Sequence, residues 1–198
     1  PALYYVFVLE INFLVQPGAI GIDENEKIIF NNLFNDVLIT FSIIFFYLIL
    51  FLFFKIIRIK NILNFKNILI SASVFLICLN NFDYNYFYSG GGIFFKTSYY
   101  VFSNNYLFYL ISLFAILIIC PLVLKNYWNI LLFVIIILNN PQYTIYHKYF
   151  DPFLLIAFLT IFSFNIDLKK IFSEKNYPFI FAYFLAFLVI SNLRLIYV

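Results

Sequence analysis

Charged side chains are scarce in this chain. Only 11% of its 198 residues are Asp, Glu, Lys or Arg, whereas soluble globular domains carry about 25%. Hydrophobic residues make up 65% of the sequence, which is more apolar surface than a water-soluble core of this size can bury. The formal net charge of +3 is spread without a basic stripe, so the sequence does not indicate nucleic-acid binding. These shortages favour a membrane protein.

Residues that build metal sites and disulfides are also rare. The single histidine excludes a multi-histidine metal cluster, and no CxxC, HExxH, Walker or GxSxG motif is present. The two cysteines, Cys78 and Cys120, fall inside apolar runs, where we expect small buried hydrophobes rather than a disulfide or half of a metal site. We therefore expect no metal and no cofactor.

Methionine is absent, and the sequence begins at Pro1 without the charged region of a signal peptide. We interpret the chain as a fragment that lacks an N-terminal part. No repeat of 20 to 50 residues and no Pro/Ser linker divides it, so we predict a single membrane domain over residues 1–198.

Long apolar runs dominate what is present. At about 20 residues per bilayer crossing, the chain has room for six to eight spans. The runs are continuously apolar rather than alternating, which favours helices over a barrel. We predict an all-α, polytopic helical membrane protein with about seven transmembrane or half-membrane helices. The expected segments are approximately 1–15, 36–54, 67–80, 105–124, 127–140, 152–166 and 178–195.

The distribution of basic residues predicts the orientation of these segments. If successive loops alternate between the two sides, one side receives eight of the twelve lysines and arginines and is expected to be cytoplasmic. We therefore place loops 55–66 and 167–177 in the cytoplasm. Loops 16–35, 81–104 and 141–151 are placed on the non-cytoplasmic side of a membrane, which we expect to be a bacterial inner membrane.

The first outer loop, 16–35, combines a Pro-Gly turn with the acidic residues Asp23, Glu24 and Glu26. It is either a solvated turn leading into a helix start, where acidic side chains suit the positive helix end, or an amphipathic helix on the membrane surface. The second loop, 81–104, contains Gly90, Gly91 and Gly92 followed by Lys96. The glycines are either a flexible tip or a place where backbone N–H groups approach an anion.

The third outer loop, 141–151, contains the only histidine. Pro141 is expected to end one helix and Pro152 to begin the next. His147 and Lys148 offer hydrogen-bond donors and positive charge for a phosphate, while Tyr146 sits at the headgroup level. Asp151 either caps the following helix or orients a neighbouring base. The alternative is an aromatic interfacial loop with a capping aspartate.

The stretches "NPQYTIYHKYFDP" and "SGGGIFFK" resemble segments in the C-terminal membrane halves of C-type multi-spanning glycosyltransferases. These include relatives of the eukaryotic alpha-glucosyltransferases that act on dolichol-linked oligosaccharides. The resemblance implies sugar transfer on the non-cytoplasmic face from a polyprenyl-phosphate sugar donor. Members usually carry an essential acidic residue in their first outer loop, and no residue of this chain matches it, so the catalytic residue is unassigned.

Three functional interpretations follow. The first is a membrane glycosyltransferase, or its C-terminal half, in which His147, Lys148 and Lys96 bind the lipid phosphate. The second is a transporter or lipid flippase, which predicts ionisable or glycine-broken positions near the middle of the membrane. The third is a structural or respiratory-chain membrane subunit. We also expect loops 81–104 and 141–151 to lie close together and to form one pocket at the outer surface.

Overall fold

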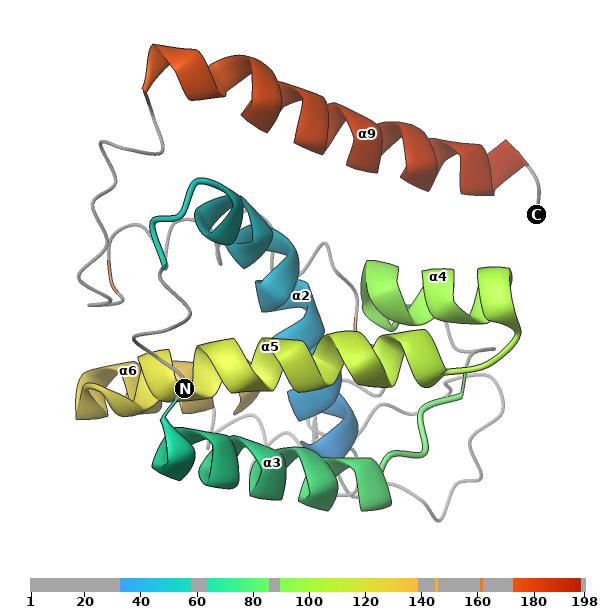
Figure 1. Cartoon of the computed structure of the whole chain (residues 1–198). Coiled ribbons are helices and arrows are strands. Elements are labelled where there is room, and N and C mark those ends of the chain that lie inside the picture. The colour runs from blue at the N-terminus through green and yellow to red at the C-terminus, as the bar shows by residue number, and fades with distance from the viewer. Residues whose placement is uncertain are drawn as a thin grey trace, which may run out of the picture.

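The computed structural model describes residues 33–57, 64–85, 90–138 and 173–196, together with residues 145 and 161. Throughout these parts the regular structure is helical and no strand is present, which confirms the predicted all-α class (Figure 1). The elements are α2 (Leu33–Phe53), α3 (Phe65–Asn80), α4 (Gly92–Phe102), α5 (Tyr106–Leu124), α6 (Tyr127–Leu138), a 3₁₀ turn η4 (Glu174–Asn176) and α9 (Tyr177–Ile196).

Five of the seven predicted segments correspond to observed helices: α2, α3, α5, α6 and α9. The largest difference is at the start of α2, which was expected at residue 36 and begins at Leu33. The predicted segment 1–15 lies outside the described residues, as does 152–166 apart from residue 161. Continuous apolar composition therefore located the helices well.

Within the described parts of the chain, two helices, α2 and α5, are long and apolar enough to cross a membrane. The helices α3 and α6 are apolar but shorter, with 16 and 12 residues. A helix rises 1.5 Å per residue, so these shorter helices alone do not cover a hydrocarbon core about 30 Å thick. By length and composition, two of the described helices could therefore cross a membrane, and the polytopic arrangement stays a prediction.

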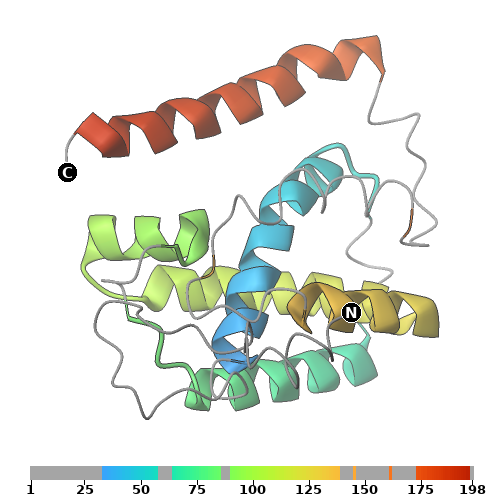
Figure 2. The same ribbon diagram turned by 180° about the vertical axis from the view of Figure 1, so that it is seen from behind.

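Helix α2 forms the centre of the bundle, and most of its side chains are buried. It passes across the pair formed by α3 and α5, which run antiparallel beside each other (Figures 1 and 2). On another side of α2, Phe41 contacts Phe133 of α6 with ring centroids 4.7 Å apart. The core therefore lies around α2 rather than between two equal layers.

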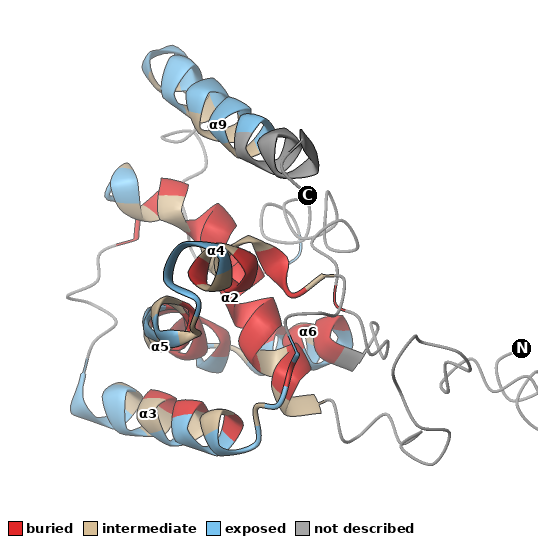
Figure 3. Cartoon of the chain, turned by 90° about the vertical axis from the view of Figure 1, so that its right-hand side faces the viewer, coloured by how far each residue is buried: buried red, intermediate tan, exposed pale blue. Residues whose placement is uncertain are grey.

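Helix α9 packs on the outside of α2 through aromatic side chains. The Tyr183 hydroxyl donates a 2.7 Å hydrogen bond to the Phe46 carbonyl, and Phe179 stacks on Phe53 with ring centroids 4.1 Å apart. Much of the rest of α9 is exposed (Figure 3). Exposed apolar residues on this helix suit contact with lipid.

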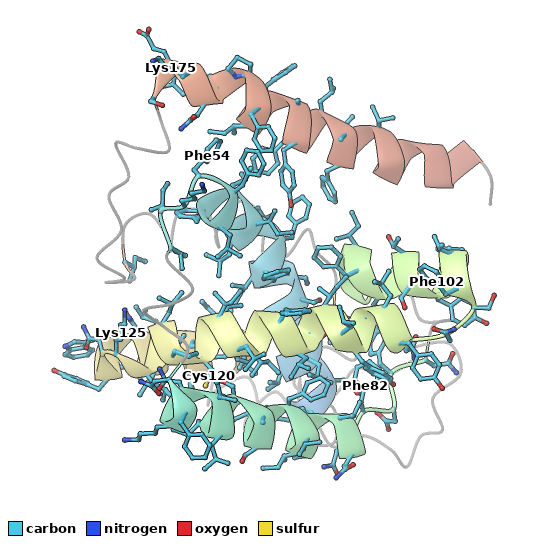
Figure 4. The ribbon with its side chains drawn as sticks, viewed as in Figure 1. Phe54, Phe82, Phe102, Cys120, Lys125 and Lys175 are labelled. Atoms are coloured by element: carbon cyan, nitrogen blue, oxygen red, sulfur yellow. The ribbon has the colours of Figure 1, made fainter. Side chains whose placement is uncertain are left out.

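The helix termini form two groups at opposite ends of the bundle. Phe54, Lys125 and Lys175 lie toward one end, whereas Phe82 and Phe102 lie toward the other (Figure 4). We call the first the basic end, where α2 and α5 finish and α3 and α9 begin (Figure 1). We call the second the glycine end, where α3 and α4 finish and α5 begins.

The prediction that residues 81–104 form an outer loop requires a correction. Residues 92–102 form α4, and Gly92 packs against Ile43, the central residue of α2. A Cβ atom on Gly92 would lie 3.1 Å from Ile43 Cγ1. Phe102, the last residue of α4, lies at the glycine end (Figure 4). The chain before Gly92 therefore enters the bundle, and α4 runs from there back to the glycine end. Non-helical backbone at the depth of the membrane core is tolerated where protein surrounds it.

Candidate functional site

Polar residues gather where the start of α2 meets the segment after α3. The Asn35 side chain is 1% exposed, and its Nδ2 donates a 2.5 Å hydrogen bond to Asp83 Oδ1. In return, Asn35 Oδ1 accepts a 3.1 Å hydrogen bond from the Asp83 backbone N–H. This reciprocal pair fixes the entry of α2 against the chain that leaves α3.

Asp36 is buried in the first turn of α2, with 5% of its surface exposed. A carboxylate near a helix start is stabilised by the positive end of the helix dipole, but a buried charge also needs polar partners. With spacings of three and seven residues, Asp36 shares a helix face with Ile39 and Ile43. A Cβ on Gly92 would contact both isoleucines, so this face of α2 is directed toward the start of α4.

Lys96 is buried in α4, with 6% of its surface exposed. It follows Gly92 by four residues and therefore lies on the same face of α4. Asp36 and Lys96 are thus carried by the helix faces that meet at Gly92. Lysine and aspartate are rarely this buried in proteins unless they interact with other polar groups.

The segment that contains the three glycines holds residue 145 inside the bundle by hydrogen bonds. Gly91 N–H donates a 2.7 Å hydrogen bond to the Ile145 carbonyl, and the Ile145 N–H donates a 3.3 Å hydrogen bond to the Tyr84 hydroxyl. The Ile145 side chain is fully buried. Both backbone groups of Ile145 are therefore held by the segment that contains the glycines. We call this arrangement the Ile145 clamp.

Two features of the clamp require glycine. Gly90, Gly91 and Gly92 have φ angles of 104°, 83° and 75°, a region that side-chain-bearing residues rarely adopt. In addition, a Cβ on Gly90 would lie 2.5 Å from the Ile145 carbonyl oxygen. The glycines are not an exposed flexible tip, because Gly91 and Gly92 are buried. The Gly91 N–H binds a protein carbonyl rather than an anion.

Aromatic side chains pack against Tyr84, whose hydroxyl is part of the clamp. The Tyr84 ring packs edge-on against Phe95, with centroids 5.3 Å apart, and Phe95 packs similarly against Phe108 at 5.2 Å. Ser98 links the two helices that carry these rings. Its hydroxyl donates to the Asn104 carbonyl at 2.7 Å and accepts from the Phe108 N–H at 3.2 Å. The base of the site is therefore a packed, hydrogen-bonded unit.

The structure brings together part of the predicted site. Gly90, Gly91, Gly92 and Lys96 lie in and beside the clamp, and the expected approach of segments 81–104 and 141–151 is confirmed at Ile145. This contact is inside the bundle rather than at its surface. The remaining predicted residues, Tyr146, His147, Lys148 and Asp151, lie outside the described residues, so a shared pocket stays a prediction.

Sequence reasoning missed the burial of Asp36 and the roles of Asn35 and Tyr84. Asp36 was counted as one more acidic residue of an outer loop, although its place directly before an apolar run was a usable signal for a helix start. Nothing local distinguishes Tyr84 among the 17 tyrosines. Among the described residues, no group of three or more His, Cys, Asp or Glu side chains is placed to hold a metal ion.

Cys78 and Cys120 are both buried and unpaired as disulfides, which confirms the interpretation of two small buried side chains. Comparisons with protein-family models, with curated proteins and with solved structures each found no match for this chain. Functional inference therefore depends on the residues and their geometry.

Proposed function

We propose that this chain is an integral membrane protein that binds the phosphate of a lipid-linked substrate at its glycine end and transfers a sugar from a polyprenyl-phosphate donor. The observation that supports this proposal is the hydrogen bond between Gly91 and Ile145. It joins the two segments that carry the resemblance to C-type glycosyltransferases.

The covalent chain keeps the candidate cations near this contact. Consecutive Cα atoms are 3.80 Å apart, so the Cα atoms of His147 and Ile145 are separated by at most about 7.6 Å. Lys96 follows Gly91 by five residues along α4, a rise of about 7.5 Å. Two predicted phosphate ligands, Lys96 and His147, thus belong to the two chain segments that this hydrogen bond joins.

The proposed chemistry requires cations for the departing phosphate and a carboxylate for the acceptor. Lys96, His147 and Lys148 supply donors and positive charge that stabilise the phosphate as the glycosidic bond breaks. Asp36 lies on the α2 face that is directed toward α4. We assign its carboxylate the role of activating the acceptor hydroxyl. Water exclusion by the surrounding apolar helices strengthens these interactions.

A transporter or lipid flippase is the second candidate, and a specific observation favours it. The glycine-broken backbone reaches the level of Ile43 at the middle of α2, and two ionisable residues, Asp36 and Lys96, are buried in the bundle. Half-helices that begin at mid-depth and buried ionisable groups are typical of transporter substrate sites.

One reconstitution separates the two candidates. The purified chain is placed in vesicles with a radiolabelled polyprenyl-phosphate sugar and a lipid-linked acceptor, and sugar transfer and lipid translocation are measured in parallel. Transfer that falls at least tenfold in Lys96→Gln but not in Lys66→Gln supports the transferase. The control removes an exposed lysine at the basic end. Translocation without transfer supports the flippase, and neither activity in the wild type contradicts both.

A further inference from the structure

The basic end has a composition unlike that of the glycine end. Its four described lysines, Lys55, Lys66, Lys125 and Lys175, are all exposed, and Glu174 is the one described acidic residue beside them. At the glycine end, by contrast, Lys96 and Asp36 are buried. The basic end therefore presents positive charge outward, whereas at the glycine end Lys96 and Asp36 are buried and the exposed charge among the described residues is that of Asp83.

Two helices begin at the basic end with the same tripeptide. Lys-Asn-Tyr occurs at 125–127, directly before and into α6, and again at 175–177, directly before and into α9. Each copy places a lysine in the turn and a tyrosine at the first helical position. Lys125 and Lys175 lie at the same end of the molecule on separate helices (Figure 4).

The single tryptophan, Trp128, directly follows the first copy. Asn126 Oδ1 accepts a 3.1 Å hydrogen bond from the Trp128 N–H, which caps the start of α6. The rings of Tyr127 and Trp128 lie with centroids 4.8 Å apart, and Trp128 is 55% exposed. This capped turn directs two amphipathic aromatic side chains outward beside Lys125.

We infer that Lys125, Tyr127, Trp128, Lys175 and Tyr177 form an interfacial girdle that binds the anionic phospholipid headgroups of one leaflet. Indole and phenol rings favour the boundary between headgroups and acyl chains, because one part of each ring is apolar and the other forms hydrogen bonds. Lysine side chains extend their ammonium groups from that level to the phosphates. The positive charge of the girdle complements an anionic leaflet.

This inference is independent of the proposed function, because it concerns the opposite end of the bundle and requires no enzymatic activity. The girdle sets how deeply α5, α6 and α9 are inserted, since the two Lys-Asn-Tyr turns lie toward the same end of the molecule (Figure 4). A transferase, a transporter or a structural subunit would each use it in the same way.

The chain contains one tryptophan and 17 tyrosines, so fluorescence excited at wavelengths longer than the tyrosine absorption band reports on Trp128 alone. The full chain is reconstituted in vesicles whose phospholipids carry bromine either near the glycerol or near the chain terminus. We expect the shallow bromine to quench Trp128 more strongly. Stronger quenching by the deep bromine, or quenching by aqueous iodide with no effect of brominated lipid, overturns the girdle.

A second measurement tests the charge selectivity. Shallow-brominated phosphatidylglycerol and phosphatidylcholine are compared at equal fractions in an excess of unlabelled phosphatidylcholine. A lysine near an anionic surface contributes up to about a fivefold preference, so we expect phosphatidylglycerol to quench more, with the difference lost in a Lys125→Gln/Lys175→Gln variant. A Lys125→Arg/Lys175→Arg variant, which keeps both positive charges, is the control and should keep the preference. Equal quenching by the two lipids in the wild type overturns the anionic assignment.

Discussion

Gly90 and Ile145 lie so close that a single methyl group would not fit between them. A Cβ atom built on Gly90 would lie 2.5 Å from the Ile145 carbonyl oxygen, the same oxygen that accepts the hydrogen bond from Gly91. Residues separated by 55 positions are therefore joined at a point where only glycine leaves enough room.

We expect Gly90→Ala to displace residue 145 from the clamp. The added methyl meets backbone atoms, and φ at residue 90 is 104°, so the free energy of unfolding should fall by about 1–3 kcal/mol. Thermal unfolding in detergent measures the loss. Ser73→Ala on the exposed face of α3 is the control and should change stability little. Equal stability of the two variants would contradict the clamp.

The Tyr84 hydroxyl should stabilise the same clamp through its hydrogen bond, separately from the packing of the Tyr84 ring. Tyr84→Phe keeps the edge-on contact with Phe95 and removes the acceptor of the Ile145 N–H. A buried N–H without its partner costs about 1–3 kcal/mol. Tyr106→Phe, at an exposed tyrosine, is the matched control. Unfolding curves that coincide for both variants would show that this hydrogen bond is dispensable.

The Asn35–Asp83 pair predicts an unequal response to two alanine substitutions. Asn35→Ala removes both hydrogen bonds of the pair, whereas Asp83→Ala removes only the one to the carboxylate, since the second uses the Asp83 backbone N–H. We expect Asn35→Ala to be the more destabilising, with a coupling energy of about 0.5–3 kcal/mol in the double-mutant cycle. A larger loss in Asp83→Ala would contradict this account.

The orientation of the two ends is testable by cysteine labelling. In a Cys78→Ala/Cys120→Ala background, Asn85→Cys should react with an impermeant thiol reagent in intact cells, and Lys66→Cys only after permeabilisation. Both positions are exposed: Lys66 lies in the first turn of α3, and Asn85 lies in the segment that follows its end. The reason is the excess of basic residues on the cytoplasmic side. The opposite labelling pattern would invert the proposed topology.

The helices of this protein were predictable because their signal is local. Each of α2, α3, α5, α6 and α9 coincides with a continuous apolar run, and in a low-dielectric medium such a run satisfies its backbone polar groups by forming a helix. The two cysteines were predictable for the same reason, since apolar neighbours on both sides favour burial. Composition and hydropathy along the chain carry this information without any knowledge of tertiary contacts.

The structure of segment 90–102 was decided by tertiary contacts. Three glycines followed by a mixed sequence are typical of a loop, and the αL conformation of Gly91 at the start of α4 is stabilised by a hydrogen bond to a residue 54 positions away. The burial of Asp36 and Lys96 likewise is a property of the folded bundle rather than of their neighbours in the sequence. Local sequence determined the helices that follow apolar runs, namely α2, α3, α5, α6 and α9. Close approach of distant backbone atoms determined how α4 begins, because hydrogen bonds and steric fit depend on distance in space rather than along the chain.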